Sequence, residues 1–509
     1  MSPLMMAHRR GAWLVVASLL AACGARSSVL VDDDTTGFGA GGAVAGQGGV
    51  RTAGAPPAGA PAGGAPAGGA PSAGAPSAGA PTNAGAPGAG AGGGPAACTP
   101  DGLGCPNGFA CDAGTCLTKC DSIKQCRPDR FCADQACPLK AKHIAAGVSD
   151  TCAVLVDDSV RCWGDGDAGQ LGDGLASTST TPVTVKPISD AASGVNQIEL
   201  GVLFACAVTS LGRGSCWGAG DLGQLGAGTL DASATPVPIL GSDPMRKLTE
   251  VGAGRYHACG IWTGGAVRCW GANFDGQLGT GDTVSSVMPV PIAGTPDPTT
   301  SDVVSGDAHT CILVAGGISG PKVRCWGDNS ELQLGIPGPM SSSTPLDLPI
   351  TPGAAGGSIT DLQAGAYHNC VLYSDGSVRC WGDNSQQQLG VPTPALSAQS
   401  VPVGLPSGTF AVAISAGEQH TLALLKDGRV MCWGNSAACG VKTMNGTAPV
   451  AIGNLDPPGQ FPTAISAGST HSCALMSDGS ARCWGSNYDG ALGAPATEYT
   501  PTAAPVLPW

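Results

Sequence analysis

The residues best suited to chemistry in this sequence are five histidines that recur at regular intervals. They are His257, His309, His368, His420 and His471. Asp150 and Phe204 occupy the same position further upstream. Histidine can serve as a general acid, a general base or a metal ligand. A catalytic or metal site brings different residue types to one point, whereas these positions repeat one type. We therefore expect the histidines to form hydrogen bonds between strands.

The histidines belong to a motif that occurs seven times. Seven tryptophans, each between Cys and Gly, are separated by 51 to 56 residues: Trp163, Trp217, Trp270, Trp326, Trp381, Trp433 and Trp484. The fifth copy runs from Ala364 to Gly382 and is followed by Gln-Leu-Gly at residues 388–390. Within it, an apolar run reaches an Asp-Gly turn and returns through a second run, which predicts a β-hairpin.

Units of about 50 residues that each form a small antiparallel sheet bury their faces by stacking, and a closed ring leaves no open ends. The seven units therefore predict an all-β fold, a seven-bladed β-propeller over residues 139–509.

The cysteines of these repeats predict their own pairing. Five pairs stand ten residues apart: Cys152 and Cys162, Cys206 and Cys216, Cys259 and Cys269, Cys370 and Cys380, Cys473 and Cys483. Cys311 and Cys325 are four residues further apart, with the extra residues inside the turn, as expected for partners that face each other across a hairpin. The sixth copy has Leu422 in place of its first cysteine, so we predict a bond between Cys432 and Cys439.

The N-terminal residues form a predicted export signal. Basic residues 8–10 precede an apolar run over 11–22, which is too short to span a bilayer. Residues 20–24 read Leu-Ala-Ala-Cys-Gly and resemble the lipobox of bacterial lipoproteins. The resemblance implies a signal peptide over 1–22 and a lipid on Cys23. Because Gly24 is not the aspartate that retains some lipoproteins in the inner membrane, we expect an outer-membrane lipoprotein of the cell envelope. An ordinary secretory signal is the alternative.

Residues 23–97 form a predicted tether. From about residue 37 the segment is almost entirely Gly, Ala and Pro with very little charge. It cannot bury enough apolar surface to offset its ordering entropy, so we expect disorder. As a flexible coil it would span about 45–50 Å and hold the following domains away from the membrane.

A cysteine-rich module is predicted over residues 98–138. Its eight cysteines are Cys98, Cys105, Cys111, Cys116, Cys120, Cys126, Cys132 and Cys137. Apolar residues are few, so disulfides must replace a hydrophobic core. We expect four disulfides, with the connectivity open. A zinc site is the alternative, although the module contains no histidine. Without Cys23, the remaining 22 cysteines of the chain then form eleven pairs.

Composition limits the possible partners. The 23 cysteines are unlike those of a cytosolic protein, where thiols stay reduced. A formal net charge of -13 argues against broad phosphate contacts. We therefore expect neither nucleic acid nor nucleotide as a partner, and contact with the membrane through the lipid anchor alone.

The repeated pattern resembles a known family. His-x-Cys-Ala-Leu, Asp-Gly, Cys-Trp-Gly and Gly-Gln-Leu-Gly together are similar to the regulator-of-chromosome-condensation repeat, over roughly residues 139–509. The resemblance implies a seven-bladed propeller whose faces bind proteins. Nuclear members exchange guanine nucleotides on a small GTPase and dock on chromatin, which an exported acidic chain would not do. A secreted bacterial β-lactamase inhibitor on a similar propeller implies an extracellular binding role, with Phe274, Tyr488 and Tyr499 as candidate face residues.

Other chemistry has weaker support. The acidic turns at 165–167 and 273–276 suggest calcium loops, but both lack the sixth-position Gly and the closing Glu of an EF-hand. Ser374-Asp375-Gly376-Ser377 has features of a sialidase Asp-box at the wrong spacing. Common hydrolase and phosphate-binding motifs are absent from the sequence. We expect no catalytic residue, metal or cofactor, and predict a protein-binding scaffold with an unknown partner. A glycan-active or hydrolytic propeller enzyme and a purely structural envelope protein are the alternatives.

Overall fold

The computed structural model describes residues 111–112, 115–116, 126, 129–130, 137–188, 194–242, 245–316, 320–350, 356–440, 448–494 and 498–507. The predicted signal peptide, Cys23, the tether and most of the cysteine-rich module lie outside these residues. In the module, β1 (Cys111–Asp112) pairs with β2 (Thr115–Cys116), and Cys126 is bonded to Cys137. No helix within the described ranges is long and apolar enough to cross a membrane.

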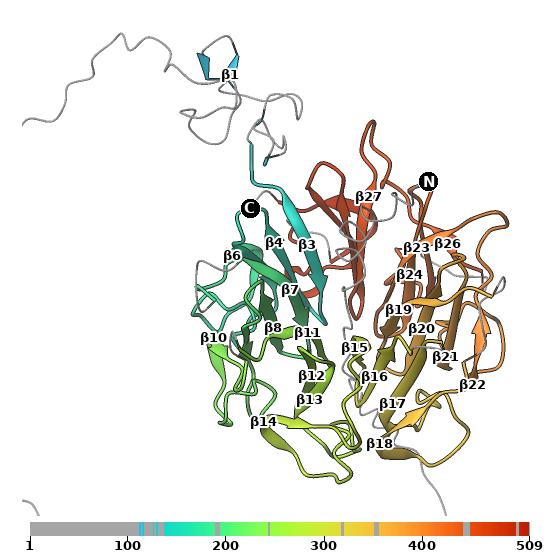
Figure 1. Ribbon diagram of the computed structural model, residues 1–509. Helices are drawn as coiled ribbons and strands as arrows, with labels where there is room; N and C mark the ends of the chain where they lie inside the picture. Colours follow the sequence, from blue (N-terminus) through green and yellow to red (C-terminus); the bar gives the residue numbers. More distant parts are fainter. Residues whose placement is uncertain are drawn as a thin grey trace, which may run out of the picture. The chain divides into compact units, whose positions relative to one another are not determined.

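Seven four-stranded antiparallel sheets follow one another along the chain, and each is built from four consecutive strands. We number them blade 1 to blade 7. Their first strands surround the axis of the ring (Figure 1). These strands are β3 (Ala141–Ala146), β7 (Val195–Leu200), β11 (Leu248–Ala253), β15 (Thr300–Ser305), β19 (Ile359–Ala364), β23 (Ala411–Ala416) and β27 (Pro462–Ala467). The predicted seven-bladed all-β propeller is therefore confirmed.

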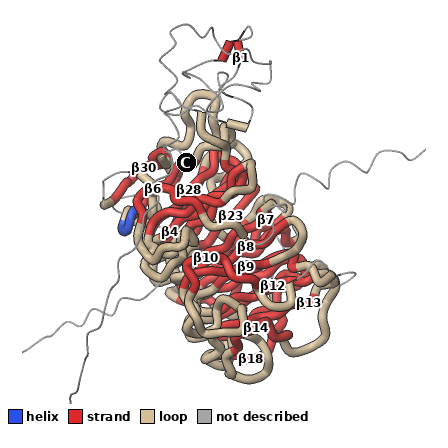
Figure 2. Tube along the Cα trace, turned by 90° about the vertical axis from the view of Figure 1, so that its left-hand side faces the viewer, coloured by secondary structure: helices blue, strands red, loops and turns tan. Residues whose placement is uncertain are grey.

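The other three strands of each blade step outwards from the axis. The second strands are β4 (Asp150–Leu155), β8 (Phe204–Thr209), β12 (His257–Trp262), β16 (His309–Val314), β20 (His368–Tyr373), β24 (His420–Leu425) and β28 (His471–Met476). The third strands are β5 (Val160–Gly164), β9 (Gly214–Gly218), β13 (Ala266–Gly271), β17 (Lys322–Asp328), β21 (Val378–Asp383), β25 (Val430–Gly434) and β29 (Ala481–Ser486). The fourth are β6 (Ser179–Thr184), β10 (Ser233–Pro238), β14 (Ser286–Pro291), β18 (Ser341–Asp347), β22 (Leu396–Pro402), β26 (Val450–Ala451) and β30 (Tyr499–Pro505). Strands and loops account for nearly all of the described chain (Figure 2).

The repeat cysteines face each other across the hairpin of the second and third strands. Cys259 stands directly opposite Cys269, and the same register recurs in five other blades. These six disulfides have Cα–Cα distances of 4.0 to 4.1 Å. In blade 6 Leu422 lies opposite Cys432, which is bonded to Cys439 in the following loop. Each of the seven propeller pairs expected from the sequence is a disulfide in the structure.

The glycine of each Cys-Trp-Gly is required by the backbone. It lies where the third strand shifts register against the fourth, and in all seven blades its φ is between 99° and 108°. A Cβ atom at Gly271 would lie 2.4 Å from the carbonyl oxygen of Tyr256. A side chain at this position would therefore meet both an unfavourable backbone conformation and a backbone atom.

The core lies between neighbouring blades. Each repeat tryptophan is fully buried, and Trp326 of blade 4 packs in one cluster with Cys259 and Leu278 of blade 3. The glycine of each Gln-Leu-Gly makes room for the tryptophan of the next blade. At Gly279, for example, a Cβ atom would lie 2.7 Å from Nε1 of Trp326. Stacking of adjacent blades thus buries the sheet faces, as the repeat length predicts.

Blade 7 meets blade 1 by the same kind of contact. The backbone N–H of Ser469 donates to the carbonyl of Gly147 at 3.0 Å, and that of Ala146 donates to Ser466 Oγ at 2.7 Å. Trp163 of blade 1 donates through Nε1 to the carbonyl of Ala491, just after the short 3-10 helix η3 (Tyr488–Gly490), at 2.9 Å. These bonds close the ring.

The propeller has two faces. We call the loop face the one formed by the connections between first and second strands and between third and fourth strands. The turn face is formed by the hairpin turns between second and third strands and by the links from one blade to the next. The antiparallel order of each blade places these two sets of connections at opposite ends of its strands.

Candidate functional site

The recurrent histidines lie at the boundaries between blades. Nε2 of His257 in blade 3 lies 2.8 Å from Oγ1 of Thr310 in blade 4. Four more boundaries carry an equivalent bond of 2.8 to 3.0 Å: His309 to Asn369, His368 to Thr421, His420 to Ser472 and His471 to Thr151. All five imidazoles are fully buried. The predicted hydrogen-bonding role between strands is confirmed, and the bonded strands belong to different blades.

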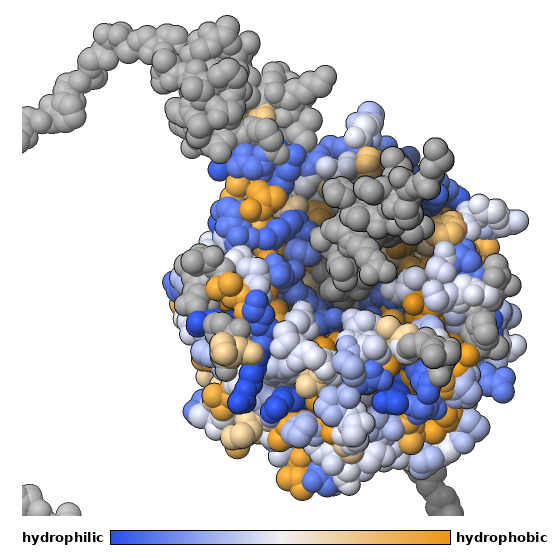
Figure 3. Space-filling view, in the orientation of Figure 1, coloured by the Kyte–Doolittle hydropathy of each residue, from blue (hydrophilic) through white to orange (hydrophobic). Residues whose placement is uncertain are grey.

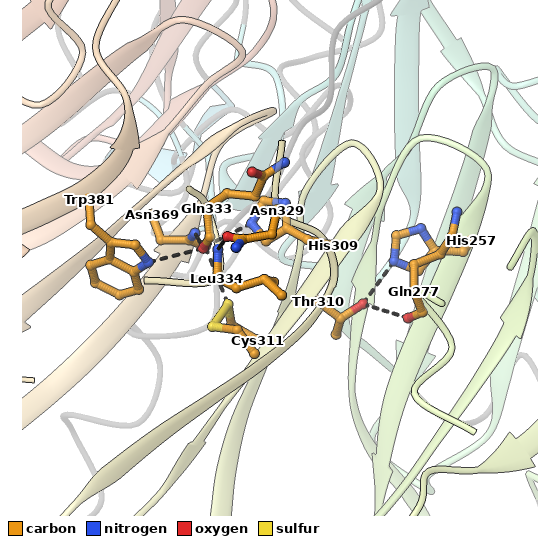
Figure 4. The surroundings of a disulfide bond; sticks show 11 residues. His257, Gln277, His309, Thr310, Cys311, Asn329, Gln333, Leu334, Asn369 and Trp381 are labelled. Carbon is orange, nitrogen blue, oxygen red and sulfur yellow. Dashed lines mark hydrogen bonds between the residues drawn. A yellow bond between two sulfur atoms is a disulfide. The ribbon is translucent and has the colours of Figure 1, made fainter. Parts of the chain in front are cut away.

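The hydrogen-bond network fixes the direction of these bonds (Figure 4). The hydroxyl of Thr310 donates to the carbonyl of Gln277 at 3.1 Å, so its oxygen accepts from His257. The imidazole therefore carries its proton on Nε2. Asn369 leads to the same conclusion, because its Oδ1 can only accept from His309, while its Nδ2 donates to the carbonyl of Gln333.

The carbonyl of Gln277, which accepts a hydrogen bond from the hydroxyl of Thr310, also accepts one from a tryptophan. Nε1 of Trp326 donates to the carbonyl of Gln277 at 2.8 Å. Five other boundaries have the corresponding tryptophan bond: Trp163 to Ala491, Trp217 to Gln170, Trp270 to Gln224, Trp381 to Gln333 and Trp433 to Gln388. Histidine, hydroxyl, carbonyl and indole thus form one chain of contacts across a boundary, which explains why the repeat contains both His and Trp.

The two exceptions to the histidine pattern agree with this network. At the boundary next to Asp150 of blade 1, the position that holds the histidine's partner elsewhere is Ala205 of blade 2. At the boundary next to Phe204 of blade 2, it is Ala258 of blade 3. Thus, where the histidine is missing, the next blade also has no polar side chain at the partner position. Burial and the nearby Asp165 raise the pKa of Asp150 well above its ordinary value. The paired loss marks the histidine as a packing element of the boundary.

The environment of the histidines does not suit acid–base chemistry. Burial, with a smaller contribution from neighbouring histidines, lowers the pKa of His257, His368 and His420 to about 3. Burial also lowers the pKa of His471 to about 4. A general acid or base works best with a pKa near the operating pH and within reach of a substrate. These neutral, enclosed imidazoles therefore act in architecture.

A set of polar side chains on the innermost strands, three of them acidic, is not predicted from the sequence. The third residue of the first strand is Gln197, Glu250, Asp302 and Asp361 in blades 2 to 5. Oε1 of Gln197 accepts the N–H of Val251 at 3.0 Å, and Oε1 of Glu250 accepts that of Val303 at 2.9 Å. Oδ2 of Asp302 accepts the N–H of Leu362 at 3.3 Å. Each side chain therefore caps a backbone donor on the innermost strand of the next blade.

Burial favours the protonated form of these carboxyls. Burial raises the pKa of Glu250 to about 7, although its bond to Asp302 opposes the shift. Burial raises the pKa of Asp302 and of Asp361 well above the ordinary value, and in each case a neighbouring carboxylate adds to the effect. A convergent acidic group near the axis is what a hydrolytic enzyme would need. Here the carboxyl oxygens are bonded to backbone N–H groups, and their contacts assign them to packing between blades.

The candidate face residues differ in position. Phe274 is 65% exposed and Tyr488 is 73% exposed, and both lie in loop-face connections. Tyr499 starts β30 and is half-buried, and burial raises its pKa. In the space-filling view, exposed hydrophobic residues form separate groups among hydrophilic ones (Figure 3).

The acidic turns have structural roles. Oδ1 of Asp165 accepts the N–H of Asp167 at 3.0 Å, as Oδ1 of Asp328 does from Ser330 in blade 4. Asn273 holds its loop through Oδ1, which accepts the N–H of Leu278 at 2.9 Å. The described residues contain no group of three or more His, Cys, Asp or Glu side chains arranged to hold a metal ion. Turn formation accounts for the contacts at both acidic turns.

The fold and the boundary contacts define a seven-bladed propeller whose blades repeat a His-Cys-Trp-Gly-Gln signature. The sequence profile of the Regulator of chromosome condensation (RCC1) repeat matches residues 248–277, 301–333, 359–388, 411–440 and 463–491. A second profile of the same repeat matches 216–261, 264–313 and 375–424. The chain therefore contains repeats of the regulator-of-chromosome-condensation family over residues 216–333, 359–440 and 463–491.

Individual relatives extend the comparison. The ultraviolet-B receptor UVR8 of Arabidopsis thaliana is 29% identical over 70% of this chain and 79% of its own length. The human probable E3 ubiquitin-protein ligase HERC6 is 30% identical over 60% of this chain, which spans only 29% of HERC6. Among solved structures, yeast RCC1 (Prp20) bound to Kap60 superposes with a TM-score of 0.60, at 21% identity and with 68% of this chain and 83% of that chain covered. This last likeness shows the fold.

Proposed function

We propose that this chain is a cell-envelope lipoprotein, anchored through a lipid on Cys23, that displays its propeller as a protein-binding scaffold. The observation that carries the binding role is how the polar side chains of the blades are used. Histidines and inner-strand acids are committed to boundaries between blades, whereas Phe274 and Tyr488 project from the loop face. Such a molecule is a rigid ring with variable loops.

The disulfides support export. Seven disulfides lie within the propeller, and an eighth joins Cys126 to Cys137. Disulfides of this density persist in oxidising compartments. The lipobox-like Leu-Ala-Ala-Cys-Gly at residues 20–24 favours lipid attachment, and Gly24 favours the outer membrane. The Gly/Ala/Pro segment would then serve as the tether between lipid and propeller.

The comparisons favour a protein as the partner. One superposed structure is itself a complex of a related propeller with the protein Kap60. The net charge of -13 disfavours nucleic acid. The partner would reach the propeller from the surrounding envelope space while the lipid holds the chain at the membrane.

The anchor can be tested by labelling. Cells that express the full chain are fed an alkyne-tagged fatty acid, and the wild type is compared with Cys23→Ser. We expect label and membrane association for the wild type only. Equal labelling of both proteins would contradict lipidation at Cys23.

The scaffold role can be tested in living cells. A photo-crosslinking amino acid is placed at Phe274 on the loop face or at Phe461, which is 56% exposed and lies in a turn-face connection. We expect a discrete cross-linked protein from one face. The same background from both positions would favour the purely structural alternative.

A further inference from the structure

Carboxylates occur on both faces of the propeller, whereas the described cations lie almost entirely on one face. Among the described residues, eleven carboxylates that are exposed or half-exposed lie in loop-face connections: Asp165, Asp167, Asp173, Asp221, Asp231, Asp275, Asp282, Asp328, Glu331, Asp489 and Glu498. The cation in the described part of these connections is Arg255. Its guanidinium is bonded to Asp307 at 3.1 Å, so it offsets little of the exposed negative charge.

The cations of the propeller lie at the other end of the blades. Fourteen described lysines and arginines belong to turn-face connections or to the adjoining ends of the strands: Lys140, Lys142, Arg161, Lys186, Arg213, Arg246, Lys247, Arg268, Lys322, Arg324, Arg379, Lys426, Arg429 and Arg482. Carboxylates such as Asp157, Asp297 and Asp456 also lie on the turn face, but the cations outnumber them there. The net charge of the chain therefore hides a charge polarity along the propeller axis. Such an arrangement produces a negative potential over one face.

Apolar side chains stand among the loop-face carboxylates. Phe274 precedes Asp275, and Tyr488 precedes Asp489. Four more exposed apolar residues lie in the connections between third and fourth strands of blades 1 to 4: Leu175, Leu230, Val284 and Met340. With Tyr488 of blade 7, they mark five blades that are consecutive around the ring. We call these six residues the apolar arc.

We infer that the loop face binds a basic protein, whose lysine and arginine side chains meet the carboxylates while its apolar side chains contact the apolar arc. This inference rests on the proposed scaffold function and names the chemistry of its partner. Complementary potentials steer association and set specificity, and exposed aromatic side chains supply the contact energy once the partner has docked.

Other ligands fit this face less well. Nucleic acid would bring phosphates towards an excess of carboxylates, which costs free energy. A bound metal ion needs several ligands that converge within coordination distance, whereas these carboxylates are distributed over five of the seven blades. A basic protein surface is broad enough to contact many of them at once.

The test uses the full chain in detergent and two synthetic probes. One is a 20-residue peptide of alternating Lys and Leu that carries a fluorophore, and the other has Glu in place of Lys. Binding is followed by fluorescence anisotropy at about 50 and 500 mM NaCl, because exposed ion pairs are screened over this range. We expect the Lys peptide to bind at low salt at least about tenfold more tightly than at high salt, and the Glu peptide to show no saturable binding.

Matched variants locate the contact. The triple variant Asp231→Asn, Asp275→Asn and Asp489→Asn removes three loop-face charges. The control triple Asp157→Asn, Asp297→Asn and Asp456→Asn removes the same charge from the turn face. Asparagine forms the same turns as aspartate, so both variants should fold, and circular dichroism with a melting temperature checks this. We expect about a tenfold loss of affinity in the first triple and less than about a twofold change in the control.

A further pair tests the apolar arc. The double variant Phe274→Ala and Tyr488→Ala should weaken binding of the Lys peptide, whereas Phe461→Ala on the turn face should leave its affinity unchanged. The inference would be overturned if both Asn triples lost affinity for the Lys peptide equally, or if neither triple changed that affinity. If cross-linking then still captures a protein at Phe274, the scaffold function stands and only the basic character of its partner is wrong.

Discussion

Nε2 of His257 donates to Oγ1 of Thr310 across the boundary between blades 3 and 4, at 2.8 Å. The two residues are 53 positions apart, which is one repeat plus the step from histidine to its neighbour. The same hydroxyl donates onward to the carbonyl of Gln277. A single buried oxygen thus joins the second strands of two blades to the loop that follows a third strand.

This relationship predicts a compensated double variant. Thr310→Ala leaves the Nε2–H of His257 buried without an acceptor, so we expect a loss of about 1–3 kcal/mol in the free energy of unfolding. Adding His257→Phe recreates the Phe204 and Ala258 combination of the boundary between blades 2 and 3. We expect the double variant to recover part of the loss in urea denaturation. A double variant less stable than Thr310→Ala alone would show that the bond is not the source of the effect.

The histidines also predict an acid limit to stability. In the folded state the pKa is about 3 for His257, His368 and His420 and about 4 for His471, below the ordinary 6.5. The unfolded chain therefore takes up protons first as the pH falls, and stability is lost below about pH 6.5. We expect the urea midpoint of His420→Gln, relative to that of the wild type, to rise as the pH falls from 6.5 to 4.5. A slope unchanged by that variant would place the acid sensitivity elsewhere.

The inner-strand carboxyls predict the opposite effect over an overlapping pH range. The pKa of Glu250 rises from 4.5 to about 7 on folding, so the folded chain holds a proton that the unfolded chain has released. The associated stability is present below about pH 4.5 and is lost as the pH rises through 7. Glu250→Gln keeps an oxygen for the N–H of Val303, as Gln197 does for Val251.

We therefore expect Glu250→Gln to raise the melting temperature at pH 8.5 and to change it little at pH 5. The control is Asp456→Asn, an exposed carboxylate on the turn face, which should have little effect at either pH. A lower melting temperature for Glu250→Gln at pH 8.5 would show that the charged carboxylate is required.

Blade 6 offers a test of the disulfide register. Leu422 lies opposite Cys432 in the same register as Cys370 and Cys380, whose Cα atoms are 4.1 Å apart. We expect Leu422→Cys combined with Cys439→Ala to form the hairpin bridge found in the other blades. Thiol titration of the unfolded protein should then find no free cysteine in the propeller. Cys439→Ala alone should expose one thiol, that of Cys432.

Much of this architecture could be predicted because the sequence motif repeats at regular intervals. The spacing of the seven tryptophans indicates the number of blades, and the constant interval between paired cysteines indicates a hairpin. The longer interval between Cys311 and Cys325 strengthens that prediction, because the insertion falls inside the turn. These features depend on local geometry, and the spacing of residues that are close in the sequence reflects that geometry directly.

The boundary contacts were harder to predict because they join residues about one repeat apart. The repeated positions of the histidines predict hydrogen bonds between strands, but their partners Thr310 and Thr421 carry no local signal of that role. Glu250 and Asp302 look like ordinary polar residues of a strand. A shared third position in the first strands of four blades was the available signal, and its meaning depends on the neighbouring blade.

The closure of the ring has a consequence for how the chain can be cut. The boundary between blades 7 and 1 has a histidine bond, from His471 to Thr151, like four other boundaries, and a tryptophan bond to a loop carbonyl, like five others. Each blade is a complete sheet of four consecutive strands. The boundary where the chain closes on itself is therefore built like most of the others, and the propeller is a candidate for circular permutation at a boundary that has both bonds.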